Sequence, residues 1–142
     1  MKNFHWIILA ILSAFFAALV TIFGKIGVKD IDSTLATTIR VLIMTIFLVG
    51  VSFFFQKWPL ISTISSRPLL FIILSGLAGA LSWLFYFLAL KFGPAGVVAA
   101  LDRLSVVFVI FLAALFLGEG LHFQTVLGII LLISGTILLV FQ

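Results

Sequence analysis

The sequence predicts an all-α polytopic membrane protein, built as a bundle of five transmembrane helices. Of its 142 residues, 65% are hydrophobic and only 8% are charged, and the mean hydropathy is +1.48. Soluble domains are about 25% charged, so this chain has too few charges to cover a water-facing surface. The apolar residues also run in continuous stretches of about 20, the length of a helix that crosses a bilayer. Strands of a membrane barrel would instead alternate over about ten residues.

The first two predicted helices flank a short charged turn. We expect the first over residues 4–26, because this stretch is too long for the core of a signal peptide and further spans follow it. We expect the second over residues 33–55, where Asp32 or Ser33 supplies an oxygen that caps the N-terminus. Pro59 lies just beyond its end.

Glycines, prolines and polar residues separate the other three predicted helices. The longest polar interval, residues 56–68, precedes a helix expected over residues 69–90. Pro94 suits the start of the next helix, expected over residues 95–117. After a short break with two glycines, the last helix is expected over residues 123–141.

Length and composition exclude several classes of function. Five spans use about 100 residues, so we expect one transmembrane domain over residues 1–142 and no soluble catalytic domain. The chain has no cysteine, which excludes disulfides, cysteine-ligated zinc and iron–sulfur clusters. It also shows no catalytic triad, paired catalytic carboxylates or phosphate loop. We therefore expect neither enzymatic activity nor a cofactor or metal site.

The basic residues are expected to contact the lipid bilayer and not nucleic acid. The eight Lys and Arg are scattered singly, as loop anchors and headgroup contacts are. With five spans, the loop charges divide evenly between the two sides: Lys2, Lys57 and Arg67 against Lys25, Lys29 and Lys91. This balance gives no firm orientation, even if two arginines inside the spans reach back to the second side. Either the signal is weak, or the chain inserts both ways and pairs with an inverted copy.

Charged residues inside the predicted spans are candidates for function, because charges are costly in a bilayer. Asp102 and Arg103 lie about eight residues into the fourth segment, and Arg40 lies at a similar depth in the second. Asp102 is too short to reach the interface, so we expect it to face a cavity, water, or a basic partner such as Arg40 or Lys25. A buried ion pair that fixes helix register and a contact with polar substrate or a proton both remain open.

Other candidates lie at helix faces and ends. Trp83 and Tyr86 are three residues apart and share a helix face, either in packing or lining a cavity. Glu119 lies between two glycines at a membrane boundary, where it serves local hydrogen bonding or gating. Gly128 and Gly135 lie on one face of the last helix. Such small residues pack helices closely, within the subunit or at a dimer seam.

Several short motifs resemble a known family. They are Phe87-Leu88-Ala89-Leu90, the run from Gly93 to Leu101, Leu115 to Glu119, Gly128 to Leu131 and Ser134-Gly135-Thr136, with Phe23-Gly24-Lys25 as a weaker match. Together they resemble the EamA-type domain of the drug/metabolite transporter superfamily. The resemblance implies secondary transport of small metabolites through a cavity lined by the first four helices, with the fifth at a dimer contact.

Two departures from that family matter. Typical members carry two five-helix repeats, whereas this chain has one. This difference implies a homodimer, with antiparallel copies as one arrangement, or a second half-transporter as partner. Asp102-Arg103 also interrupts a helix that is apolar in typical members. We expect a multi-pass protein of the cell membrane (plasma or inner) that moves small metabolites, amino acids or drugs. A lipid-linked-sugar flippase subunit and a non-transporting assembly protein are the alternatives.

Overall fold

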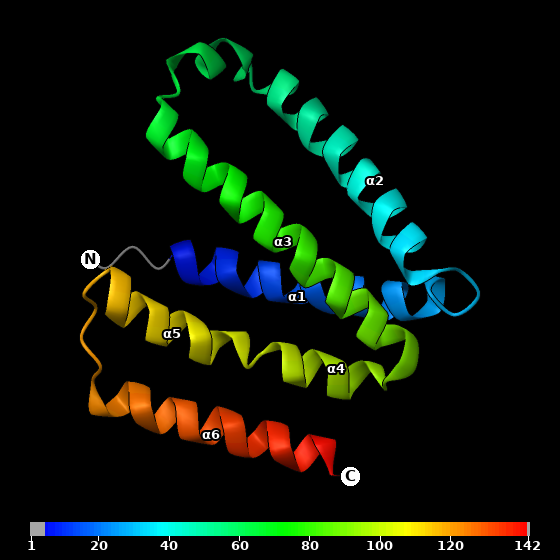
Figure 1. Cartoon of the computed structure of the whole chain (residues 1–142), viewed down its shortest axis with the longest axis vertical. Coiled ribbons are helices and arrows are strands. Elements are labelled where there is room, and N and C mark those ends of the chain that lie inside the picture. Colours follow the sequence, from blue (N-terminus) through cyan, green and yellow to red (C-terminus); the bar gives the residue numbers. More distant parts are fainter. Residues whose placement is uncertain (1–4, 142) are drawn as a thin grey trace. The chain divides into compact units, whose positions relative to one another are not determined.

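A computed structural model of the chain describes residues 5–141. Within these residues, five helices are long and apolar enough to cross a membrane. The prediction of an all-α polytopic membrane protein is therefore confirmed (Figure 1). The expected start at Phe4 and the loop charge of Lys2 lie outside the described residues.

The helices follow one another with short connections. In order they are α1 (His5–Gly27), α2 (Ser33–Phe54), the 3-10 helix η1 (Trp58–Thr63), α3 (Ser66–Phe92), α4 (Ala95–Asp102), α5 (Ser105–Phe116) and α6 (Phe123–Val140). Most bounds lie within a few residues of those expected. The helix α3 begins earlier, at Ser66, and includes Pro68, because proline is tolerated in the first turn, where its missing amide has no helical partner.

The fourth span is interrupted, where the sequence predicted one continuous helix over residues 95–117. It consists of α4 and α5, and the turn between them has hydrogen bonds that span three residues, as in a 3-10 helix. The amide of Leu104 donates to the carbonyl of Leu101 at 3.0 Å, and the amide of Val106 donates to the carbonyl of Arg103 at 3.1 Å. The Thr136 hydroxyl, on α6, reaches the carbonyl of Ala100 at 3.5 Å. A side chain that enters the hydrogen-bond ladder is a recognised cause of a helix break.

Asp32 caps the start of α2. Its carboxylate accepts hydrogen bonds from the amides of Thr34 at 2.9 Å and Leu35 at 3.0 Å. These amides have no partner within the helix, so of the two predicted caps the structure selects Asp32. The bond from Leu35 is the main reason that the pKa of Asp32 lies below its ordinary value of 3.8; the positive charge of Lys91 also contributes.

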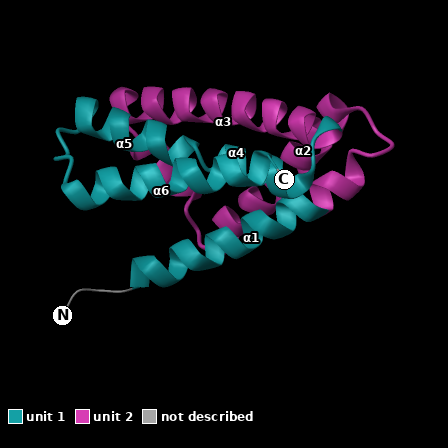
Figure 2. Ribbon diagram, turned by 90° about the horizontal axis from the view of Figure 1, so that it is seen from below, with its two compact units in different colours: residues 1–22, 92–142 teal, residues 23–91 magenta. Residues whose placement is uncertain are grey.

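The chain divides into two compact units, coloured separately in Figure 2. Unit 2 is Phe23–Lys91 and holds the end of α1, all of α2 and η1, and nearly all of α3. Within it, α2 and α3 run antiparallel and are joined through η1 (Figure 1). Unit 1 holds the described residues before Phe23 and after Lys91. Within it, α6 packs against α4.

Few side chains are buried within the protein itself. The buried apolar residues among those described are Val28, Phe87, Leu90 and Val98. Large side chains on the helix surfaces are exposed instead, as at Phe54 (81%) and Phe123 (81%). This distribution suits helices whose outer faces contact lipid, because lipid chains solvate such side chains as well as a protein core does.

Candidate functional site

Arg40 of α2 stacks on an aromatic face of α3. Its guanidinium carbon lies 3.6 Å from the centroid of the Trp83 ring and 5.3 Å from that of Phe87. Trp83 and Phe87 are four residues apart, so they share one face of α3. A cation over an aromatic ring within about 6 Å is attracted by the ring's negative face, by about 2 kcal/mol or more where water is excluded.

The aromatic rings around Arg40 also contact one another. The Trp83 and Tyr86 rings meet edge to face, with centroids 5.6 Å apart and an interplanar angle of 82°. The Phe87 ring lies 6.0 Å from that of Trp83 and 6.2 Å from that of Tyr86. We call Arg40, Trp83, Tyr86 and Phe87 the Arg40 cluster. Sequence reasoning named the first three but missed Phe87, although its spacing of four from Trp83 was a usable signal.

One nitrogen of Arg40 is buried without a hydrogen bond. Its Nη1 atom has no acceptor within the part of the chain that the structure describes. The rings satisfy the positive charge from one face, but a guanidinium also has five N–H donors in its plane. A buried donor without a partner typically costs about 1–3 kcal/mol, and more when the group is charged. An acceptor on this edge would therefore stabilise the cluster.

Lys25 of α1 binds the C-terminal end of α3. Its ammonium donates a hydrogen bond to the main-chain carbonyl of Leu90. This carbonyl is one of the last four of α3, which lack a helical partner and form the negative end of the helix dipole. Lys25 thus holds the last turn of α1 against α3, a role that the sequence did not predict.

Gly24 makes this contact between α1 and α3 close. A Cβ atom at Gly24 would lie 3.1 and 3.2 Å from two ring carbons of Phe87 and 3.5 Å from a methyl carbon of Leu90. Phe87 and Leu90 are themselves buried. The motif Phe23-Gly24-Lys25 therefore works as a packing element that supports the Arg40 cluster.

Asp102 and Arg103 lie at the interruption of the fourth span. Asp102 is the last residue of α4, and both side chains are exposed. Interrupted helices commonly line the substrate sites of transporters, because their free backbone groups and charges need a polar environment. Asp102 belongs to unit 1, whereas Arg40 and Lys25 belong to unit 2. The ion pairs predicted for Asp102 remain predictions.

Glu119 follows the turn that ends α5. Gly118 has a φ of +68°, in the left-handed region that glycine adopts without strain. The backbone amide of Glu119 then reaches back to the carbonyl of Ala113 at 3.4 Å. The Glu119 side chain is exposed, so the structure gives this residue a place at the boundary and leaves gating a prediction.

Gly128 and Gly135 lie on α6. A Cβ atom at either position would meet no described atom within 4 Å. Close packing against the described part of the chain therefore does not require glycine at these positions. The alternative expectation, a seam between subunits, stays a prediction.

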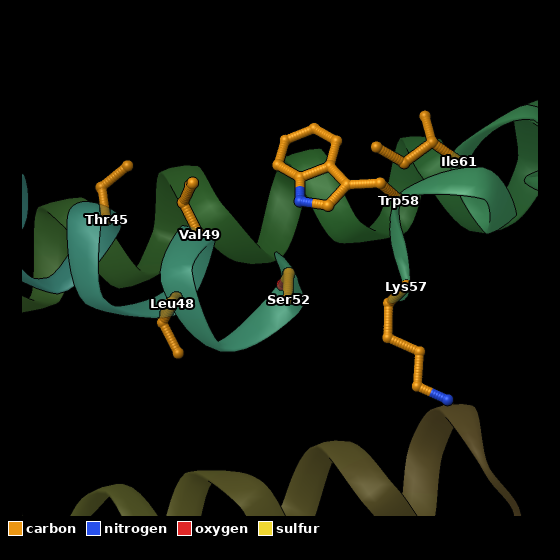
Figure 3. A pocket seen from close by; sticks show the side chains of 7 residues that line it. All are labelled: Thr45, Leu48, Val49, Ser52, Lys57, Trp58 and Ile61. Carbon is orange, nitrogen blue, oxygen red and sulfur yellow. The ribbon is translucent and has the colours of Figure 1, made fainter. Parts of the chain in front are cut away.

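Two hollows of note lie within the described residues of unit 2. One, of about 420 Å³, lies where α2 meets η1 and is lined by Thr45, Leu48, Val49, Ser52, Lys57, Trp58 and Ile61 (Figure 3). Trp58 packs on Phe53 at 4.9 Å between ring centroids, and the Lys57 side chain extends away from the Trp58 ring (Figure 3). Lysine and tryptophan at a helix end are typical of a membrane boundary, so we interpret this hollow as part of the interface.

The other hollow is a groove of about 550 Å³ between α2 and α3. Its lining includes Thr37, Val41 and Leu84, which precede or follow members of the Arg40 cluster along the two helices. The hydroxyls of Thr37 and Thr38 donate to carbonyls one turn earlier in α2, at 2.7 and 2.9 Å. Because these hydroxyls are satisfied, the groove presents mainly apolar surface.

Comparisons with known proteins agree on one family. Residues 4–141 match the EamA-like transporter family. A protein from Sinorhizobium sp., named an uncharacterized transporter in the cobO 3′ region, is 44% identical over 134 residues, which are 94% of this chain and 95% of the relative. No solved structure matches significantly. The chain belongs to the EamA-like transporter family.

Proposed function

We propose that the chain is a half-size secondary transporter that works as a dimer and moves small metabolites, amino acids or drugs across the cell membrane. The observation that carries the proposal is the family match, which spans residues 4–141 and five candidate transmembrane helices. The relative is also named as a transporter. We expect no enzymatic activity.

The interrupted span supports transport over a purely structural role. A scaffold protein gains nothing from two charged residues, Asp102 and Arg103, at a helix break inside a span. In a transporter, a polar break of this kind supplies groups for a substrate or a coupling proton. The sequence has no phosphate loop, so we propose coupling to a proton or solute gradient.

The dimer is proposed from size and from α6. A single five-helix repeat carries half the spans of typical members, so a second copy, antiparallel or parallel, or another half-transporter, completes the cavity. The open glycine positions Gly128 and Gly135 suit α6 to a close helix–helix contact between subunits.

Transport in proteoliposomes tests the proposal. Purified protein is reconstituted, and uptake of a panel of labelled amino acids and small metabolites is measured with and without an imposed proton gradient. We expect gradient-dependent uptake of at least one solute, and its loss in Asp102→Asn. Movement of labelled lipid-linked sugar alone would favour the flippase alternative, and no movement of any compound would contradict the proposal.

A further inference from the structure

The geometry points to the Arg40 cluster as a binding site for the carboxylate of a small organic anion with an apolar body. This inference rests on the proposed transport function and specifies its substrate class. It concerns residues within unit 2 only.

The first argument is the unfilled donor edge of Arg40. The Trp83 ring occupies one face of the guanidinium at 3.6 Å, which fixes the plane of the group and leaves its N–H donors pointing along its edges. The buried Nη1 has no acceptor within residues 5–141. A carboxylate matches such an edge with two parallel hydrogen bonds, whereas a neutral solute supplies weaker acceptors.

The second argument is the local balance of charge. The acidic residues of unit 2 are Asp30 and Asp32. The Asp32 carboxylate already accepts two amide hydrogen bonds as the cap of α2, and it lies about 12 Å along the helix from Arg40 at 1.5 Å per residue. Within unit 2, the positive charge of Arg40 therefore lacks a nearby anion.

The third argument distinguishes a carboxylate from a phosphate. Two other basic residues lie within helices at this end of unit 2: Lys25 donates to the carbonyl of Leu90, and the positive charge of Lys91 acts on Asp32. Arg40 thus supplies a single positive charge among three aromatic rings. One guanidinium neutralises one negative charge, which fits a monocarboxylate better than a doubly charged phosphate in an apolar setting.

The fourth argument concerns the rest of the ligand. The groove of about 550 Å³ between α2 and α3 is lined by neither Arg40 nor any other member of the Arg40 cluster, so it is not part of this site. The apolar surroundings of Arg40 are the rings of Trp83 and Phe87, which lie 3.6 and 5.3 Å from its guanidinium carbon, together with the adjoining ring of Tyr86. These rings suit a ligand whose apolar body packs beside them while its charged end binds Arg40.

The test uses Trp83 as its own reporter. The chain has three tryptophans, so replacing Trp6 and Trp58 by phenylalanine leaves only the ring that Arg40 covers. This variant of the full chain is placed in lipid nanodiscs and titrated with benzoate, and separately with benzamide, its neutral isostere. We expect a saturable change in Trp83 fluorescence with benzoate and an affinity at least tenfold weaker for benzamide.

Substitutions on the same background locate the site. Arg40→Gln should abolish the benzoate response, and Arg40→Lys should weaken it, because an ammonium keeps the charge but loses the two-pronged geometry. Arg67→Gln is the matched control, since Arg67 lies exposed in the first turn of α3, and it should leave the response unchanged. Size-exclusion profiles and circular dichroism establish that each variant folds.

Several outcomes would overturn the inference. One is a benzoate response that survives Arg40→Gln. Others are equal affinities for benzoate and benzamide, or no benzoate response in the variant that keeps Trp83 as its single tryptophan. A response seen only in Asp102→Asn would also overturn it, because Asp102 would then be the permanent partner of Arg40. Transport of neutral solutes without benzoate binding would overturn this inference and leave the proposed function standing. Benzoate binding without transport of any solute would support the binding site and contradict the proposed transport function.

Discussion

At Gly24 the end of α1 packs closely against α3. Replacing it by leucine should destabilise the fold by about 1–3 kcal/mol, the usual cost of forcing extra atoms into a packed site. The added atoms would meet the ring of Phe87, which is 3% exposed and held by its aromatic neighbours. Unfolding in detergent, followed by circular dichroism, measures the change.

The control for Gly24 lies one turn later. A Cβ at Gly27 would meet nothing within 4 Å among the described atoms, and both positions lie in the last turns of α1. Gly27→Leu should therefore leave stability unchanged or raise it slightly, because leucine favours helix over glycine. Equal effects of the two substitutions would contradict the packing described for Gly24.

Asp32 gives a prediction with a pH dependence. Its pKa is lowered in the folded protein, so its stabilising effect is complete above the ordinary value of 3.8 and is lost as the pH falls through the lower folded value. Asp32→Ala should lower the thermal midpoint at neutral pH and have little effect in strong acid. Melting curves at several pH values measure this. Asp30→Ala, an exposed neighbour that caps no helix, should show no such difference.

At the residue scale, sequence reasoning identified the candidates better than their partners. Arg40, Trp83 and Tyr86 stood out because charges and polar aromatics are uncommon inside spans. Their contact depends on how α2 and α3 are rotated about their axes, which hydropathy does not encode. Lys25 shows the same limit, since its bond to the Leu90 carbonyl depends on where α3 ends.

At the scale of elements, the pairing of α4 and α6 depends in part on one hydroxyl. Thr136 donates to Leu132 within α6 at 2.9 Å and to Ala100 of α4 at 3.5 Å. Thr136→Val keeps the shape of the side chain and removes the hydroxyl, so we expect a loss of about 0.5–1 kcal/mol, typical of such bonds in membranes. Ser134→Ala is the control, because Ser134 is exposed and donates only to Ile130 of its own helix. Unfolding in SDS compares the two, and equal losses would show that Thr136 does not join the helices.

The positions of the spans were predictable, and the break in the fourth was not. Long apolar runs bounded by polar residues identify helices in lipid without reference to partners. The turn after Asp102 contains no proline or glycine, the usual sequence signs of a break. It coincides with the hydroxyl of Thr136 on α6, 36 residues after Ala100 in the chain, so the residues around the break do not by themselves predict it.

At the scale of the whole molecule, the absence of cysteine makes subunit arrangement directly testable. If α6 pairs with an inverted copy around Gly128 and Gly135, position 128 of one chain meets position 135 of the other. Mixing chains that carry Gly128→Cys with chains that carry Gly135→Cys should then give crosslinked dimers on oxidation in membranes, while either variant alone should give few.

Other crosslinking patterns have different meanings. A parallel dimer would crosslink in each single variant, and this result would exclude the inverted arrangement. Gly50→Cys on α2 is the control: it too has open space around it, but the proposal places it outside the seam. Crosslinking there to the same extent would show random collision and contradict a specific contact through α6.

The interruption of the fourth span also has a mechanical consequence. A continuous α-helix resists bending because hydrogen bonds between residues four apart link each turn to the next. A displacement of one end is therefore transmitted to the other end. Between α4 and α5 the amides of Leu104, Val106 and Val107 bind carbonyls only three residues back. We therefore expect the span to bend at this turn more readily than within α4 or α5, which would let α4 tilt while α5 keeps its place in the bilayer.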